Sequence, residues 1–215
     1  MKIFTKLFFT ATLLSISVSG LLAQIKGITE SGDEVLLYQD GTWVYVNDSN
    51  TRLTSAIPLN EAIFTKSKKA SFLIKSKKIN VGVYISPKEW KFIKAEATEP
   101  SEFRFEKIGG DLFAMLITEK IGIPMESLSQ IALDNAKKAA PDTKLISQEY
   151  RMVNGTKVIM MQLTGTIQGI KFIYFGYYYS DDNGSVQFLT YTSQNLFEAY
   201  KKEMEKMLNG FIVRN

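Results

Sequence analysis

Hydrophobic and polar residues alternate along much of the chain, which is the pattern of strands that bury one face of a sheet. Beyond about residue 70, this alternation predicts a first antiparallel series of strands. We expect them at Phe72–Ile74, Ile79–Ile85, Trp90–Lys94, Phe103–Lys107 and Leu112–Thr118. Turn residues such as Asn154-Gly155 then separate a second series, a meander of longer strands. We expect these at Lys144–Met152, Lys157–Thr166, Lys171–Ser180 and Ser185–Thr192.

Two segments have a helical period instead. Pro124 suits the first turn of a helix and Glu126 suits its positive end, so a helix is predicted from Pro124 to about Ala139. Near the end of the chain, large apolar residues recur every three or four positions, which predicts an amphipathic closing helix. Its apolar stripe consists of Phe197, Tyr200, Met204, Met207 and Phe211.

The amino terminus has the pattern of a secretory signal peptide. Lys2 and Lys6 precede an apolar run, Leu7–Ala23, that holds no acidic residue. A small residue ends this run, so we interpret residues 1–23 as the signal peptide and Gln24 as the first mature residue. The alternative is an uncleaved anchor, although the run is shorter than the ~20 apolar residues that a spanning helix prefers. Cleavage removes two lysines and lowers the net charge from +4 to +2.

The mature chain divides at a polar stretch. Residues 24–47 are predicted to form a small three-stranded β-meander, because turns such as Asp40-Gly41 separate its alternating runs. Residues 48–69 lack a clear period and are interpreted as a linker, and residues 70–215 as the main domain. The segment Asp40–Trp43, Asp-Gly-Thr-Trp, resembles one that is common just after the signal peptide in secreted proteins of Bacteroidetes-type bacteria.

The chain contains no Cys and no His. These absences exclude disulfides, thiolate nucleophiles, lipid-modified cysteines, His-bearing zinc sites and Ser-His-Asp triads. We therefore expect a protein that is not an enzyme and that uses no cofactor and no metal. Together with the signal peptide, the composition predicts a monomer that is periplasmic or secreted, is not a lipoprotein and does not bind nucleic acid.

The main domain is predicted to be α+β, an antiparallel sheet packed by two main helices. One helix follows Pro124, and a second, Phe197–Phe211, follows the Tyr-rich strands; this order of elements resembles the PsbP-like fold of the PsbP and DcrB type. The resemblance covers about residues 70–215. It implies a sandwich of sheet and helices and a role as a non-catalytic adaptor, assembly factor or stabiliser of a larger complex.

The densest aromatic segment is Phe172–Tyr179. A strand would place Tyr174 and Tyr178 on one face and Phe175, Tyr177 and Tyr179 on the other. We hypothesise that a partner or small ligand binds a surface formed by Tyr174, Tyr178, Tyr191 and Trp90. The alternative is that these aromatic residues fill both faces of a central strand as core.

Lysines also gather between Glu61 and Glu89 with no acid between them. Such a patch would attract an anionic glycan, lipid headgroups of the envelope surface or an acidic partner. The alternative is a solvated strand edge, where lysine prevents edge-to-edge pairing. The predicted patch consists of Lys66, Lys68, Lys69, Lys75, Lys77 and Lys78.

Two groups of acidic residues are candidates for other chemistry. Paired carboxylates among Glu96, Glu99, Glu102 and Glu106 would suit a Glu-based hydrolase, a remote alternative because the group straddles Pro100 and fits a solvated loop. Asp181, Asp182 and Asn183 lack the alternating ligands of a calcium loop and fit a hairpin turn.

Two hypotheses for function follow. The first is an exported, non-enzymatic protein that binds a partner or stabilises an envelope assembly. Its alternative is a carrier that holds an apolar or glycan ligand between the sheet and the closing helix. A closed apolar pocket would favour the carrier, and an exposed, flat aromatic patch would favour the partner-binding protein.

Overall fold

The computed structural model describes residues 25–29, 32, 34–37, 43–46, 57–96 and 99–214. The predicted signal peptide and the first part of the predicted linker lie outside the described residues. Within these ranges, no helix combines the length and the apolar character that crossing a membrane requires.

The first described strands form a small antiparallel sheet in the order β1-β2-β3. Its strands are β1 (Ile25–Ile28), β2 (Glu34–Leu37) and β3 (Trp43–Tyr45). They fall within the segment for which the sequence predicts a meander.

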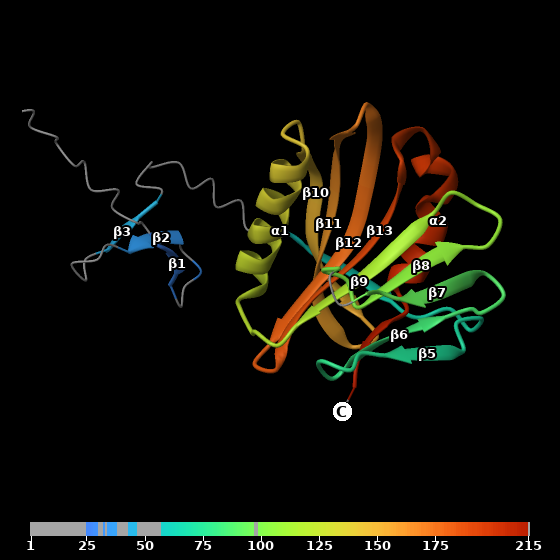
Figure 1. Ribbon diagram of the computed structural model, residues 1–215. Coiled ribbons are helices and arrows are strands. Elements are labelled where there is room, and N and C mark those ends of the chain that lie inside the picture. The colour runs from blue at the N-terminus through green and yellow to red at the C-terminus, as the bar shows by residue number, and fades with distance from the viewer. Residues whose placement is uncertain are drawn as a thin grey trace, which may run out of the picture.

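A large sheet of eight strands forms the body of the protein, in the order β4-β10-β11-β12-β13-β9-β8-β7 (Figure 1). Its strands are β4 (Leu59–Phe64), β7 (Trp90–Lys94), β8 (Phe103–Lys107), β9 (Phe113–Glu119), β10 (Lys144–Val153), β11 (Thr156–Ile167), β12 (Ile170–Asp181) and β13 (Gly184–Ser193). Neighbouring strands are antiparallel except β4 and β10, which run parallel. The predicted antiparallel sheet is therefore a mixed sheet.

The remaining elements of the described residues are another three-stranded sheet, in the order β14-β6-β5, and two α-helices. Their bounds are β5 (Phe72–Lys75), β6 (Val81–Ile85), β14 (Phe211–Val213), α1 (Met125–Ala139) and α2 (Phe197–Leu208), with a 3-10 turn at Gln194–Leu196 before α2. Figure 1 shows α1 and α2 on opposite sides of the large sheet. The prediction of an α+β domain with two main helices is confirmed.

Two predicted boundaries are wrong. The predicted linker contains β4, an edge strand whose residues Leu59 and Ile63 are 57% and 80% exposed, so its sequence lacks the alternation of a half-buried strand. The predicted closing helix ends early, at Leu208, and Phe211 belongs to β14, which pairs with β6. Local periodicity does not reveal this pairing, because β6 is distant in the chain.

Helix α1 begins directly after Pro124, as predicted, and packs on β11 and β12. The helix contributes Leu128 and Ala132 to a small core, and the sheet contributes Ile159, Met161 and Tyr178. This core occupies the face of the sheet that also carries the even-numbered aromatic residues of β12.

The main core lies on the opposite face, between the large sheet, α2 and the β14-β6-β5 sheet. Its fully buried side chains include Tyr177, Phe188, Met204, Leu208 and Phe211. These side chains fill the space between the sheet and α2, which is where the carrier hypothesis requires a cavity.

Two tight hairpins fix the register of the long strands. Both turn residues of the β10–β11 hairpin, Asn154 and Gly155, have positive φ, at 48° and 84°. The β11–β12 hairpin repeats this arrangement at Gln168 and Gly169, with φ of 51° and 81°. Turns with two positive φ angles match the right-handed twist of the paired strands, which explains why Gly occurs at both turns.

Candidate binding sites

Two of the four predicted binding residues, Tyr174 and Tyr191, lie at the centre of a row of aromatic rings. Tyr174 on β12 is directly opposite Tyr191 on β13, and Tyr191 is opposite Phe113 on β9. The ring centroids are 5.4 Å apart for Tyr174 and Tyr191 and 5.6 Å for Tyr191 and Phe113. Phe172 extends the row, 4.8 Å from Tyr174. We call Phe113, Tyr191, Tyr174 and Phe172 the aromatic row.

The aromatic row lies on the same face as α1, which packs on β11 and β12. On this face, four neighbouring side chains are half-buried: Tyr174, Tyr191, Phe113 and Met115. Burial raises the pKa of both tyrosines above the ordinary value. The row is therefore a set of packed, neutral rings, of which Phe113, Tyr191 and Tyr174 are partly accessible at the surface of the sheet.

The other two predicted binding residues lie elsewhere. Tyr178 is 2% exposed, because α1 covers it, and Trp90 is 4% exposed and belongs to the main core on the opposite face. The four residues therefore do not form one surface. The strand period correctly groups Tyr174 with Tyr178, but it does not show where α1 ends.

The predicted lysine patch consists of exposed side chains around β5. Two of these lysines have specific contacts: the Lys78 ammonium donates to the Thr118 carbonyl at 3.0 Å, and the Lys66 ammonium lies 4.7 Å from the centre of the Tyr84 ring. Lys68, Lys69, Lys75 and Lys77 are exposed as well. The role of this patch in binding stays a prediction.

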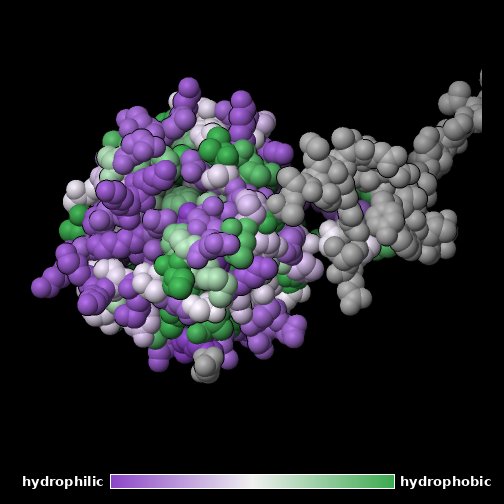
Figure 2. Space-filling view, turned by 180° about the vertical axis from the view of Figure 1, so that it is seen from behind, coloured by the Kyte–Doolittle hydropathy of each residue, from purple (hydrophilic) through white to green (hydrophobic). Residues whose placement is uncertain are grey.

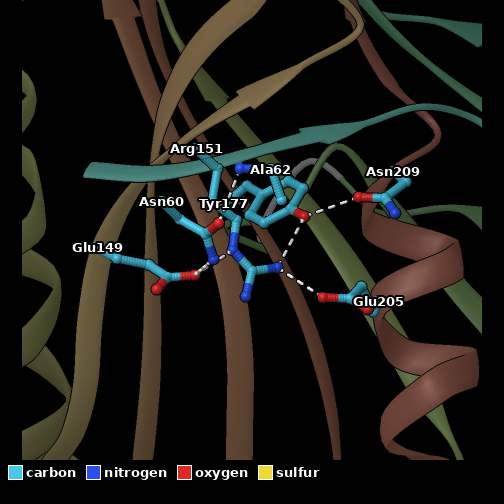
Figure 3. Close-up of polar contacts among 7 residues, drawn as sticks. All are labelled: Asn60, Ala62, Glu149, Arg151, Tyr177, Glu205 and Asn209. Atoms are coloured by element: carbon cyan, nitrogen blue, oxygen red, sulfur yellow. Dashed lines mark hydrogen bonds and ion pairs between the residues drawn. The ribbon is translucent and has the colours of Figure 1, made fainter. Parts of the chain in front are cut away.

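A buried polar network, which sequence reasoning missed, surrounds Arg151 (Figure 3). The Arg151 guanidinium, on β10, donates to Glu149 at 2.6 Å and to Glu205 of α2 at 2.7 Å. It also lies over the Phe64 ring of β4, 4.2 Å from the ring centre. Arg151 therefore links the edge of the sheet to α2.

The network extends from Arg151 to the end of α2 on one side and to β4 on the other. Tyr177 accepts a hydrogen bond from Arg151 at 3.3 Å and donates one to Asn209 at 2.7 Å, at the end of α2. Burial raises the pKa of Tyr177 to about 12, so its hydroxyl keeps the proton that it donates. On the other side, the Asn60 amide of β4 donates to Glu149 at 2.9 Å. These hydrogen bonds anchor the carboxyl end of α2 to β12 and β10.

Asn154 provides a second anchor for the end of the chain. Its side-chain amide donates to the carbonyls of Asn209 and Phe211, at 2.8 and 2.7 Å. Its side-chain oxygen accepts the backbone N–H of Lys66 at 2.9 Å. One turn residue therefore joins the segments that follow β4 and α2, and we interpret both polar clusters as structural.

The glutamates suggested for hydrolysis do not share a site. Glu102 is buried and accepts hydrogen bonds from the Ser76 hydroxyl, the Thr118 hydroxyl and the Lys77 backbone, at 2.6 to 2.7 Å. Glu99 instead pairs with Arg104 at 3.3 Å. Burial alone would raise the pKa of Glu102, but the three donors outweigh burial and lower the pKa below its ordinary value of 4.5. A carboxyl group held ionised in this way is unsuited to act as a general acid.

The Asp181–Gly184 segment is the turn of the β12–β13 hairpin. The Asp181 carboxylate accepts hydrogen bonds from the Tyr179 hydroxyl at 2.9 Å and the Asn183 backbone at 2.8 Å. Its oxygens therefore already have partners within the turn. The described part of the chain contains no group of three or more acidic side chains arranged to hold a metal ion.

A groove that the sequence did not reveal lies beside β7, with a volume of about 440 Å³. Phe72 and Phe92, 46% and 44% exposed, stack across it with ring centroids 5.8 Å apart. Trp90 and Ile85 are also part of its lining. On the face seen in Figure 2, by contrast, apolar side chains form small patches separated by polar ones.

Comparison with sequence-family models and with curated proteins finds no match to the chain. Comparison of structures finds similarity to cyanobacterial PsbP (CyanoP) from Synechocystis sp. PCC 6803, with a TM-score of 0.51 and 14% identity over 67% of this chain and 93% of that protein. LpqN of Mycobacterium tuberculosis, which is involved in cell envelope biogenesis, gives a TM-score of 0.48 and 8% identity, over 67% of this chain and 90% of LpqN. The similarity to CyanoP shows the fold: the α+β part of this chain has a PsbP-like fold, as predicted.

The burial of Tyr178 gives a first prediction. Tyr178→Ala leaves a cavity between α1 and the sheet and should lower the free energy of unfolding by about 3–5 kcal/mol. Chemical denaturation measures this change. Lys171→Ala, at an exposed position of the same strand, is the control and should stay within about 0.5 kcal/mol of the wild type. A loss below about 1 kcal/mol for Tyr178→Ala would show that the ring is not core.

The Arg151 network gives a second prediction. Arg151→Met leaves the carboxylates of Glu149 and Glu205 without their cation and should cost about 3 kcal/mol, the lower end for buried pairs because Glu205 is partly exposed. Adding Glu205→Gln removes one of the two unpaired charges and should restore about 1 kcal/mol of the free energy of unfolding, measured in the same denaturation assay. An unchanged unfolding midpoint for Arg151→Met would show that the network does not anchor α2.

Glu102 gives a pH-dependent prediction. Because its pKa is lowered from 4.5 in the folded protein, the ionised carboxyl stabilises the fold above that pH, and the stabilisation is lost as the pH falls through the lowered pKa. Glu102→Gln should therefore be less stable than the wild type at neutral pH, and the difference should shrink steadily below pH 4.5. Unfolding curves across this range measure it; a difference that stays constant with pH would contradict the assignment.

Proposed function

We propose that the protein is exported and acts without catalysis, by binding a partner in the cell envelope through the aromatic row. The observation that carries this proposal is the row itself: the rings of Phe113, Tyr191 and Tyr174 are in contact with one another, half-buried and set on a sheet face that extends beyond α1. Aromatic rings of this kind give large contact areas at low entropic cost, and they are enriched at protein interfaces.

Two further features support binding over the alternatives. The space between the sheet and α2 is filled by core side chains such as Phe188, Met204 and Leu208, which disfavours a carrier with its ligand beneath α2. Glu102, the most enclosed of the suggested catalytic carboxylates, is occupied by three hydrogen-bond donors. The signal-peptide pattern of residues 1–23 supports export.

Site-specific crosslinking in the native host tests the proposal. Tyr191→p-benzoylphenylalanine places a photoreactive ring in the aromatic row, and irradiation should yield a discrete adduct with one partner protein. The matched control is the same substitution at Lys202, an exposed position on α2 across the sheet. Equal adducts at both positions, or none at Tyr191, would contradict the proposal, and a small-mass adduct lost on denaturation in native mass spectrometry would favour the carrier instead.

A further inference from the structure

The groove beside β7 has features of a peptide-binding edge. Its lining includes four consecutive residues, Trp90 to Ile93, together with Phe72, Ile85 and Pro87. Successive side chains of a strand point to opposite faces, so a groove lined by consecutive residues runs along the edge of the strand and not over one face. β7 is the terminal strand of the large sheet, and its outer edge is the wall of this groove.

The backbone of β7 has unused hydrogen-bonding groups at this edge. The Ala95 N–H donates to the Glu102 carbonyl at 3.1 Å, and the Ile108 N–H donates to the Glu89 carbonyl at 2.9 Å. The odd-numbered residues of β7 therefore direct their backbone groups toward β8, and the even-numbered residues direct theirs away from it. By that alternation, the N–H and C=O groups of Phe92 and Lys94 point away from β8. Within the described ranges, no backbone hydrogen bond to these groups is found. An added strand would find a donor and an acceptor at each of these two positions.

The side chains around this edge are positively charged. Lys91 lines the groove, and Lys88 and Lys94 are exposed beside it. None of the three forms an ion pair with the residues that the structure describes. Two acids are close to these lysines. Glu89 is already bound by Lys206 at 2.8 Å, which leaves Glu106, opposite Lys91 on β8, as one acid against three lysines. The edge therefore carries an excess of positive charge.

These features indicate what kind of strand could pair with the outer edge of β7. A second copy of β7 would bring its lysines against Lys91 and Lys94, and like charges across a strand pair are unfavourable. We propose that the β7 edge binds an extended segment of a partner protein by strand addition. In this segment acidic residues alternate with apolar ones, so that apolar side chains enter the groove beside Phe72 and Phe92 while acidic side chains meet Lys91. This site is separate from the aromatic row and does not depend on it.

A synthetic peptide tests the assignment directly. The probe is an eight-residue alternating Glu-Val peptide, and its binding to the purified protein is measured by calorimetry and by hydrogen exchange. The peptide should protect the Phe92 and Lys94 amides from exchange, and its affinity should fall as salt rises. A Lys-Val peptide of the same length should not bind, and a Glu-Val peptide N-methylated on its bonding edge should bind about tenfold more weakly.

Variants of the protein separate backbone pairing from charge. Lys94→Pro removes an outward N–H without touching the β8 ladder, because proline is tolerated where the N–H of an edge strand faces solvent. It should weaken peptide binding by about fivefold more than Lys94→Ala, which removes only the charge. Lys91→Glu should abolish binding, while Lys202→Glu, the same charge change on the exposed side of α2, should not. The thermal unfolding midpoint of each variant is compared with that of the wild type, and an unchanged midpoint shows that the fold is retained.

Three results would overturn the proposal: no binding of the Glu-Val peptide at millimolar concentration, equal binding of its N-methylated form, or equal effects of Lys94→Pro and Lys94→Ala. Laurate is tested in parallel, because a fatty acid could also place an apolar chain in the groove and its carboxylate near Lys91. Displacement of the peptide by laurate without protection of the Phe92 and Lys94 amides would identify the groove as a lipid site instead.

Discussion

The middle of strand β12 is buried on both faces, so its side chains there have to fit two different cores. Tyr177 belongs to the main core beneath α2, and the next residue, Tyr178, belongs to the small core beneath α1. A shift of one residue in the register of β12 would exchange these two sets of side chains and disrupt both cores. The tight hairpins at Asn154 and Gln168 hold the meander that prevents such a shift. The positions of both helices therefore depend on the register of this one strand.

The sequence predicts most of the secondary structure, because most strands here are half-buried and most of α1 and α2 is amphipathic. Pro124 marks the start of α1, and the strands from β5 to β13 fall close to their predicted ranges. The misses share one cause. β4 and β14 are short strands whose partners, β10 and β6, are distant in sequence, and a strand that gains its hydrogen bonds from such a partner needs no periodic pattern of its own.

The candidate sites were less predictable for related reasons. The pairing of Tyr174 with Tyr191 follows from the alternation within the meander, but the burial of Tyr178 depends on how far α1 extends over the sheet. Arg151 shares its strand with the charged residues Lys144 and Glu149, so nothing in the sequence marks it as buried, and only the approach of α2 supplies its partner Glu205. The exposed edge of β7 depends on the order of strands in the sheet, which long-range pairing decides. The hydrophobic residues of β7 are visible in the sequence, but their place at an edge is not.

The pairing of β14 with β6 has a consequence for how the chain is made. β14 completes a sheet whose other strands, β5 and β6, lie near the start of the main domain, and α2, just before β14, covers the main core. While the chain is still being synthesised, that core lacks its final cover and the small sheet lacks its outer strand. Non-local contacts of this kind form only when both segments are free to meet. The main core and the small sheet can therefore be completed only after residues 197–213 have been synthesised, so the strands of the main domain that are made first depend on the segment made after them.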